Sequence, residues 1–88
     1  MSDPEPLPTV ERLRWQCRRG MLELDLALGA YLETRYAGLD ETGKRAFIEL
    51  LALDDPTLNA WLLGNSTPAD RDTASLMGAV RAAARTSA

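Results

Sequence analysis

Apolar residues recur at helical spacing throughout this chain, in short runs that glycine, proline and aspartate interrupt. Phe47, Leu50 and Leu51 stand at positions i, i+3 and i+4, and the same spacing recurs over residues 58–62. Side chains at these intervals share one face of an α-helix, whereas no segment alternates apolar and polar residues as a half-buried strand would. The pattern predicts an all-α fold, a compact five-helix bundle joined by short turns.

Helix start and stop signals divide the chain into elements. Thr9 is a favourable N-cap for a first helix from Val10, and we expect a tight corner over residues 18–20. Aspartate favours the position before a helix and proline its first turn, and these signals recur downstream. The second helix is expected over residues 21–36, and the third over residues 41–53, capped by Asp40. A short fourth helix is expected to start at Asp54-Asp55-Pro56 and run to residue 63, and the last to run from Thr67-Pro68 to residue 82.

Length and composition limit the possible functions. The chain has 88 residues, a formal net charge of -3, one cysteine and no histidine. We expect one helical domain over residues 10–82, a flexible, proline-rich start at 1–9 and a frayed tail at 83–88. A domain this small leaves little room for a large enclosed active site. A single cysteine without histidine excludes a disulfide within the chain and an ordinary Cys/His zinc site, so no metal is expected.

Charge and hydropathy argue against two classes of partner. Four basic residues, Arg12, Arg14, Arg18 and Arg19, lie within eight positions, but the overall balance is acidic and nucleic-acid binding is not expected. No apolar run approaches the roughly 20 residues that cross a bilayer, and the start resembles neither a secretory signal nor a transit peptide. We therefore expect no membrane insertion and a reducing, cytoplasmic setting.

A charged pair flanks a glycine at the start of the most regular helical run. On one continuous helix Arg19, Gly20 and Glu23 would share a stripe. The same arc continues through small side chains, namely Ala27, Ala30 and Thr34, which would let a second backbone come close. The opposite arc would face the core and carries Met21, Leu24, Leu28, Tyr31 and Leu32. Glycine costs up to about 1 kcal/mol inside a helix, so Gly20 is either an interface residue or a helix cap.

Simpler interpretations apply to the neighbouring residues. Trp15 is expected to be packed or at an interface. Asp54 and Asp55 are predicted to be helix caps before Pro56, and the alternative is a surface role for one of them. Arg19 and Glu23 alone could be an intrahelical ion pair. Cys17 has no histidine to activate it and falls on a core-facing position, so no catalytic residue and no enzyme activity are predicted.

Residues 19–23, Arg-Gly-Met-Leu-Glu, form an Arg-Gly-x-x-Glu motif. With this motif the chain resembles the small family of succinate dehydrogenase assembly factors that promote covalent FAD attachment to the flavoprotein subunit. The similarity covers residues 12–70. Its further blocks are Trp15, Cys17, Arg18, Met21, Leu24 and Asp25 around the motif, and Lys44-Arg45-Ala46-Phe47-Ile48, Leu50-Leu51, Asp54-Asp55-Pro56, Leu58 and Trp61-Leu62 downstream.

The resemblance implies an assembly factor that binds the flavoprotein subunit of succinate dehydrogenase, with that of fumarate reductase as a further candidate. It implies that FAD is attached to the partner, and we expect no tightly bound cofactor here and a monomer when free. The partner-binding residues predicted on this basis are Trp15, Arg18, Arg19, Gly20, Met21, Glu23, Asp25 and Asp54. In this hypothesis Gly20 permits close approach while Arg19 and Glu23 form hydrogen bonds across the interface. A Gly20→Arg change should then abolish function with little loss of folding.

Two other functional classes stay open at this point. One is an antitoxin-like or regulatory protein that binds and neutralises another protein. The other is a small DNA-binding helical domain that uses the arginine cluster, for which the acidic balance is a poor match. The sequence also leaves open whether free FAD binds and which flavoprotein is preferred.

Overall fold

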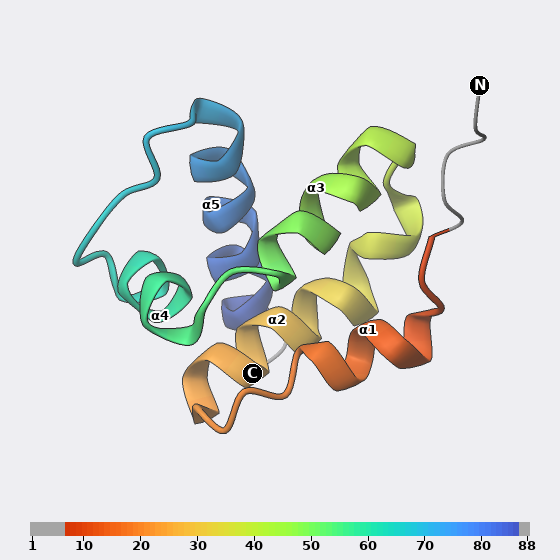
Figure 1. Ribbon diagram of the computed structural model, residues 1–88, viewed down its shortest axis with the longest axis horizontal. Helices are drawn as coiled ribbons and strands as arrows, with labels where there is room; N and C mark the ends of the chain where they lie inside the picture. The colour runs from red at the N-terminus through yellow and green to blue at the C-terminus, as the bar shows by residue number, and fades with distance from the viewer. Residues whose placement is uncertain (1–6, 87–88) are drawn as a thin grey trace.

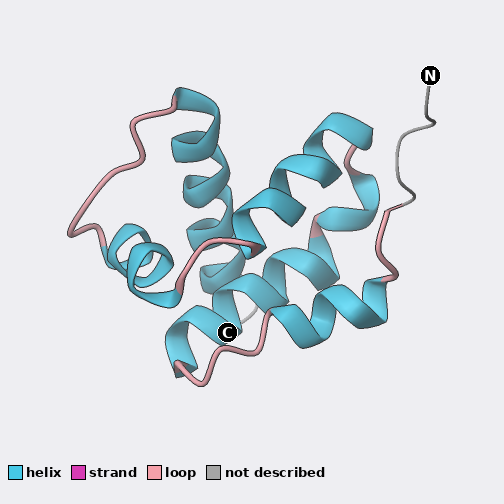
Figure 2. Ribbon diagram, in the orientation of Figure 1, coloured by secondary structure: helices cyan, strands magenta, loops and turns pink. Residues whose placement is uncertain are grey.

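The computed structural model describes residues 7–86, and over that range the chain folds into five α-helices and one 3-10 helix, without a strand (Figures 1 and 2). The elements are α1 (Val10–Gln16), α2 (Leu22–Thr34), the 3-10 helix η1 (Tyr36–Gly38), α3 (Glu41–Leu51), α4 (Asp55–Leu63) and α5 (Arg71–Thr86). The predicted all-α bundle of five helices is confirmed.

Helix α2 lies at the centre of the bundle. It contacts α1, η1, α4 and α5, and Figure 1 shows α1 running alongside it while α5 crosses it. Leu24, Leu28, Tyr31 and Leu32 are buried, and Met21 packs partly buried against them. These positions repeat at helical spacing, so the predicted core seam of this helix is confirmed.

The small side chains of α2 have a different role from the expected one. Ala27 is fully buried and Ala30 packs partly buried against the core, so both take part in the packing of this chain. The helix that comes close to α2 is α5 of the same chain, whose Val80 and Ala83 are also buried. A close approach to α2 is therefore made by a helix of the same chain.

Aromatic rings join α2, η1 and α3. The ring centroid of Phe47 lies 5.1 Å from that of Tyr31 and 5.7 Å from that of Tyr36, and all three residues are buried. Tilted pairs at these separations contribute about 0.5–1.5 kcal/mol beyond the area they bury. Phe47 therefore fixes α3 against the central helix.

Most predicted helix caps are present. Thr9 Oγ1 accepts a hydrogen bond from the Arg12 backbone N–H at 3.1 Å, and Asp40 Oδ1 accepts one from Gly43 at 2.8 Å. Asp54 Oδ1 accepts from Thr57 N–H at 3.2 Å with proline in the first turn, and α4 ends at Gly64 with φ +81°. These side chains satisfy backbone groups that lack a partner inside a helix.

Two predicted boundaries were wrong. Helix α5 begins at Arg71 rather than at Thr67-Pro68, because Asp70 caps it by accepting a hydrogen bond from the Thr73 backbone N–H at 2.9 Å. At its other end α5 continues to Thr86, with Ala83 buried, so this helix extends beyond the predicted end at residue 82. Of the expected flexible start and frayed tail, residues 1–6 and 87–88 lie outside the described residues.

Candidate functional site

The corner between α1 and α2 is built on a glycine in the left-handed region. Helix α1 ends at Gln16, α2 begins at Leu22, and Gly20 between them has φ +79°. A Cβ built on Gly20 would meet no heavy atom within 4 Å, so the backbone conformation is what requires glycine here. The expected helical stripe is wrong, because Arg19 and Gly20 precede α2 whereas Glu23 lies in its first turn.

Asp25 fixes the backbone of this corner. Its Oδ1 accepts a hydrogen bond from Arg19 N–H at 2.8 Å, and its Oδ2 accepts one from Gly20 N–H at 3.1 Å. The carboxylate also lies in the first turn of α2, where the helix dipole favours negative charge. One side chain thus satisfies two loop amides and ties them to the helix that follows.

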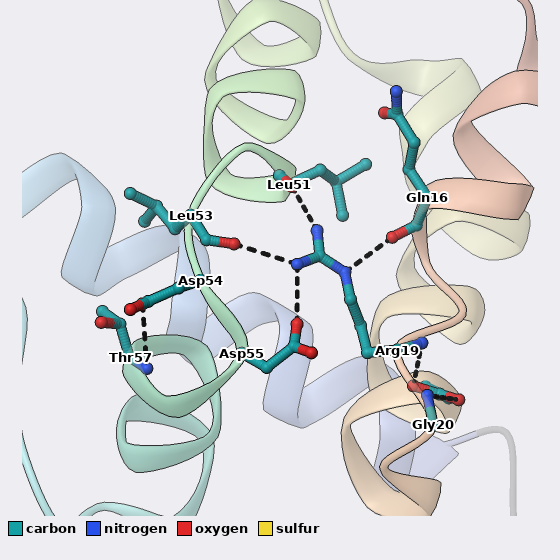
Figure 3. Close-up of polar contacts among 9 residues, drawn as sticks. Gln16, Arg19, Gly20, Leu51, Leu53, Asp54, Asp55 and Thr57 are labelled. Carbon is teal, nitrogen blue, oxygen red and sulfur yellow. Dashed lines mark hydrogen bonds and ion pairs between the residues drawn. The ribbon is translucent and has the colours of Figure 1, made fainter.

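The Arg19 guanidinium reaches inward from the corner to the ends of two helices (Figure 3). Its Nε donates to the carbonyl oxygen of Gln16 at 2.8 Å, at the end of α1. Its Nη1 donates to the Leu53 carbonyl at 2.9 Å, and its Nη2 donates to the Leu51 carbonyl. Carbonyls at helix C-termini lack intrahelical donors and attract cations, so Arg19 caps α1 and α3 together.

Asp55 completes the contacts of Arg19. Its Oδ1 accepts a hydrogen bond from Arg19 Nη1 at 2.9 Å, across 36 positions of sequence. The Arg19 side chain is 13% exposed and that of Asp55 40% exposed. Four of the five N–H groups of a guanidinium are therefore engaged within the chain. Through Arg19, the corner at residues 17–21 is joined to the corner at residues 52–54.

This geometry corrects the interpretation of two charged residues. Arg19 pairs with Asp55 and not with Glu23, so an intrahelical Arg19–Glu23 pair does not describe this motif. Asp54 caps α4 as predicted, whereas Asp55 does not cap it and binds Arg19 (Figure 3). Sequence reasoning missed Leu51, Leu53 and Asp55 as partners of Arg19, because helical spacing carries no signal about contacts more than 30 positions apart. It also missed Gln16, which lies three positions from Arg19.

Several predicted site residues remain accessible around this corner. The Trp15 side chain is 70% exposed, so the expectation that it could be packed is wrong, and the Arg18 guanidinium carbon lies 5.1 Å from its ring centroid. That distance is typical of a cation–π contact. Glu23 is exposed on the first turn of α2, and Met21 is partly buried beside the core. Accessible side chains thus lie around a corner whose backbone is held by internal hydrogen bonds.

The Cys17 thiol is buried and is not activated for reaction. Cys17 is buried as predicted, and burial raises the pKa of its thiol to about 11. A thiol with such a pKa is protonated at neutral pH and is a poor nucleophile. Among residues 7–86 no group of three His, Cys, Asp or Glu side chains could hold a metal ion, and no helix is long and apolar enough to cross a membrane.

The fold and the corner together define a class: a small helical protein whose internal polar contacts hold an exposed corner in place. The profile of a family described as "Flavinator of succinate dehydrogenase" matches residues 11–84. The chain belongs to this family.

Individual relatives agree with the family match. The protein named FAD assembly factor SdhE of Pectobacterium atrosepticum is 48% identical over 59 residues, which are 67% of each chain. That of Coxiella burnetii is 47% identical over 64 residues, 73% of this chain and 77% of the relative. That of Idiomarina loihiensis is 41% identical over 73 residues, 83% of this chain and 81% of the relative.

Proposed function

We propose that this protein binds the flavoprotein subunit of succinate dehydrogenase and promotes the covalent attachment of FAD to that subunit, without catalysing the reaction itself. Family membership supports the general role, since the family is described as a flavinator of succinate dehydrogenase. The corner supports the location: Arg19 and Asp25 hold it internally, while Trp15, Arg18 and Glu23 stay accessible. This combination of braced backbone and free side chains is the observation that carries the proposal.

The eight predicted partner-binding residues divide into two roles. Trp15, Arg18 and Glu23 contact the partner directly in this proposal, since they are exposed. The positioning residues hold the surface in place through the contacts described above, and they are Arg19, Gly20, Met21, Asp25 and Asp54. A surface fixed before binding loses less conformational entropy on association. Arg19 therefore contributes through the corner and not through a hydrogen bond across the interface.

The chemistry of flavin attachment belongs to the partner in this account. The chain has no histidine, so a flavin-linking imidazole must come from the flavoprotein. The FAD is likewise the partner's cofactor. What this chain supplies is differential binding: it stabilises the partner conformation in which the partner's own groups and FAD are aligned. The flavoprotein of fumarate reductase is a second candidate for the same surface, and the free factor is proposed to be a monomer.

Covalent flavin fluorescence of the denatured flavoprotein subunit tests the proposal. The subunit is matured with FAD alone, with the wild-type protein, or with a Glu23→Ala variant, and is then denatured to release noncovalent flavin. We expect strong fluorescence with the wild-type protein and little with Glu23→Ala or without the factor. Glu23 is exposed, so its removal should leave the fold intact, which circular dichroism checks.

A Glu41→Ala variant is the matched control. Glu41 is also an exposed glutamate in the first turn of a helix, α3, and its pair with Arg45 at 3.3 Å spans one helical turn at the surface. Such pairs contribute only about 0.3–0.5 kcal/mol. Glu41→Ala should therefore support flavin attachment as the wild-type protein does. Equal fluorescence with and without the factor would refute the proposed function.

A further inference from the structure

Large apolar side chains are exposed on one side of α2 and at the end of α4. Leu22 is 75% exposed and Leu26 is 61% exposed, one helical turn apart, and Leu63 is 51% exposed. Neighbouring exposed leucines of this kind characterise interaction sites more often than isolated ones do. None of the three belongs to the corner described above.

A shallow apolar groove lies between α2, α4 and α5 next to these leucines. Its volume is about 460 Å³, and Leu26, Ala27, Leu62, Leu63 and Ala84 form its apolar lining. Glu23 also lines this groove, so the groove adjoins the proposed partner surface, to which Glu23 belongs. A groove between helices, lined by leucine and alanine, accommodates apolar side chains of another helix.

Basic side chains border the groove. Arg81 and Arg85 line it from α5, four positions apart, so that they lie on the same side of that helix. Arg81 Nη1 also donates to the Trp61 carbonyl at 3.2 Å, which holds its side chain against α4. Both arginines are exposed, so each can pair with a carboxylate that arrives from outside.

Leu26 also forms a wall of a second hollow, on the side of α1. This hollow has a volume of about 430 Å³, and Arg14, Arg18 and Leu22 contribute to its lining. Asp25 lines it too, but its carboxylate already accepts the two corner amides. Four arginines and two acidic residues thus line the two hollows, and one of the arginines, Arg14, is already paired with Glu33 at 2.8 Å. The whole chain carries a net charge of -3. This face is basic on an acidic protein.

The charge distribution discriminates between possible occupants. A second copy docked through the same face around a twofold axis would bring together two faces of the same net positive charge, which is unfavourable. An acidic amphipathic helix matches both features, with apolar side chains for the groove and carboxylates for its basic edge. We infer that the leucine face, defined as Leu22, Leu26, Leu63, Arg81 and Arg85, docks such a helix of the flavoprotein partner. This inference rests on the proposed function, because it assigns the helix to that partner.

Binding of the unflavinylated flavoprotein subunit to the full-length factor tests the inference. Isothermal titration calorimetry gives the affinity of the wild-type protein and of Leu26→Ser, Leu63→Ser and Arg85→Glu variants. Each leucine variant should bind about tenfold more weakly, since it removes an apolar side chain that becomes buried on docking. Arg85→Glu should also weaken binding, and its affinity should depend less on salt concentration than that of the wild-type protein.

Matched controls carry the same kinds of change elsewhere. Val10→Ser replaces an exposed apolar residue on α1, and Arg35→Glu reverses a charge just after α2, at the far end from the groove. Both controls should bind as the wild-type protein does, and circular dichroism verifies that every variant is folded.

The outcomes separate the inference from the function on which it rests. Wild-type affinity in all three leucine-face variants would overturn the inference alone, because the flavoprotein would still bind. No binding by the wild-type protein would overturn both. A wild-type dimer in sedimentation that Leu26→Ser dissociates would assign the face to a second copy and would also overturn the inference.

Discussion

Replacing Arg19 with lysine isolates what the guanidinium contributes to the corner. The change keeps the positive charge and an aliphatic stem but removes the planar fork that donates to three carbonyls and to Asp55. An ammonium group is a single point with three donors, so it cannot reach acceptors at the ends of α1, α3 and α4 at once. We therefore expect Arg19→Lys to destabilise the fold although the net charge is unchanged.

The magnitude follows from the four hydrogen bonds and their exposure. Each contributes about 1 kcal/mol net, and loss of two or three of them gives about 2–3 kcal/mol. The bond to Asp55 counts least, because that carboxylate is 40% exposed and regains water when the pair is broken. In a domain of this size about 2–3 kcal/mol corresponds to a fall in Tm of roughly 8–24 °C.

Urea unfolding followed by circular dichroism measures this difference, with Arg18→Lys as the matched control. Arg18 is the adjacent arginine and is exposed over Trp15, so its replacement should change the free energy of unfolding by less than about 0.5 kcal/mol. Equal stability of the two variants would refute the reasoning, since Arg19 would then not hold the corner.

Three further predictions concern the same region. Gly20→Ala should cost about 1–2 kcal/mol of unfolding free energy because φ is +79°, and Gly20→Asn should cost less, as urea titrations can show. Asp25→Ala should lower the free energy of unfolding by about 1–3 kcal/mol in the same measurement, because two loop amides lose their acceptor. Asp25→Asn should lower it less, since the amide oxygen can still accept. Burial raises the pKa of the Cys17 thiol from 9.0 to about 11. The contribution of this buried thiol to the free energy of unfolding is therefore complete below pH 9 and is lost as pH rises to about 11. Over that pH interval the free energy of unfolding of a Cys17→Val variant should fall less than that of the wild-type protein. Tyr31 and Tyr36 should account for part of the fall that remains, since burial raises the pKa of both phenols.

Local patterns were sufficient to predict much of the fold. Leu24, Leu28 and Tyr31 follow helical spacing and are buried, and Asp40 and Asp54 cap the helices that they precede. Both kinds of signal depend only on residues within about two turns of each other, which is the range over which sequence spacing reports structure.

Other features depend on information that spacing does not contain. Arg19 binds groups 32 and 36 positions away, so its inward role follows only from the way α3 and α4 meet the corner. The corner expected over residues 18–20 is present, but the positive φ of Gly20 within it means that the stripe drawn on one continuous helix does not form. At the end of α5, Ala83 carries no bulky side chain that would indicate burial, yet it is buried in the core of a fold in which α5 packs against α2.

Nuclear magnetic resonance of the isotope-labelled protein, titrated with the unflavinylated flavoprotein subunit, tests the central claim most directly. The account predicts loss of signal intensity at the Trp15 indole N–H and at the backbone amides of Gly20 and Glu23, with the amides of α3 near Glu41 unaffected. Intensity losses confined to the side of the molecule around α3 and the start of α5, with the corner unchanged, would contradict it.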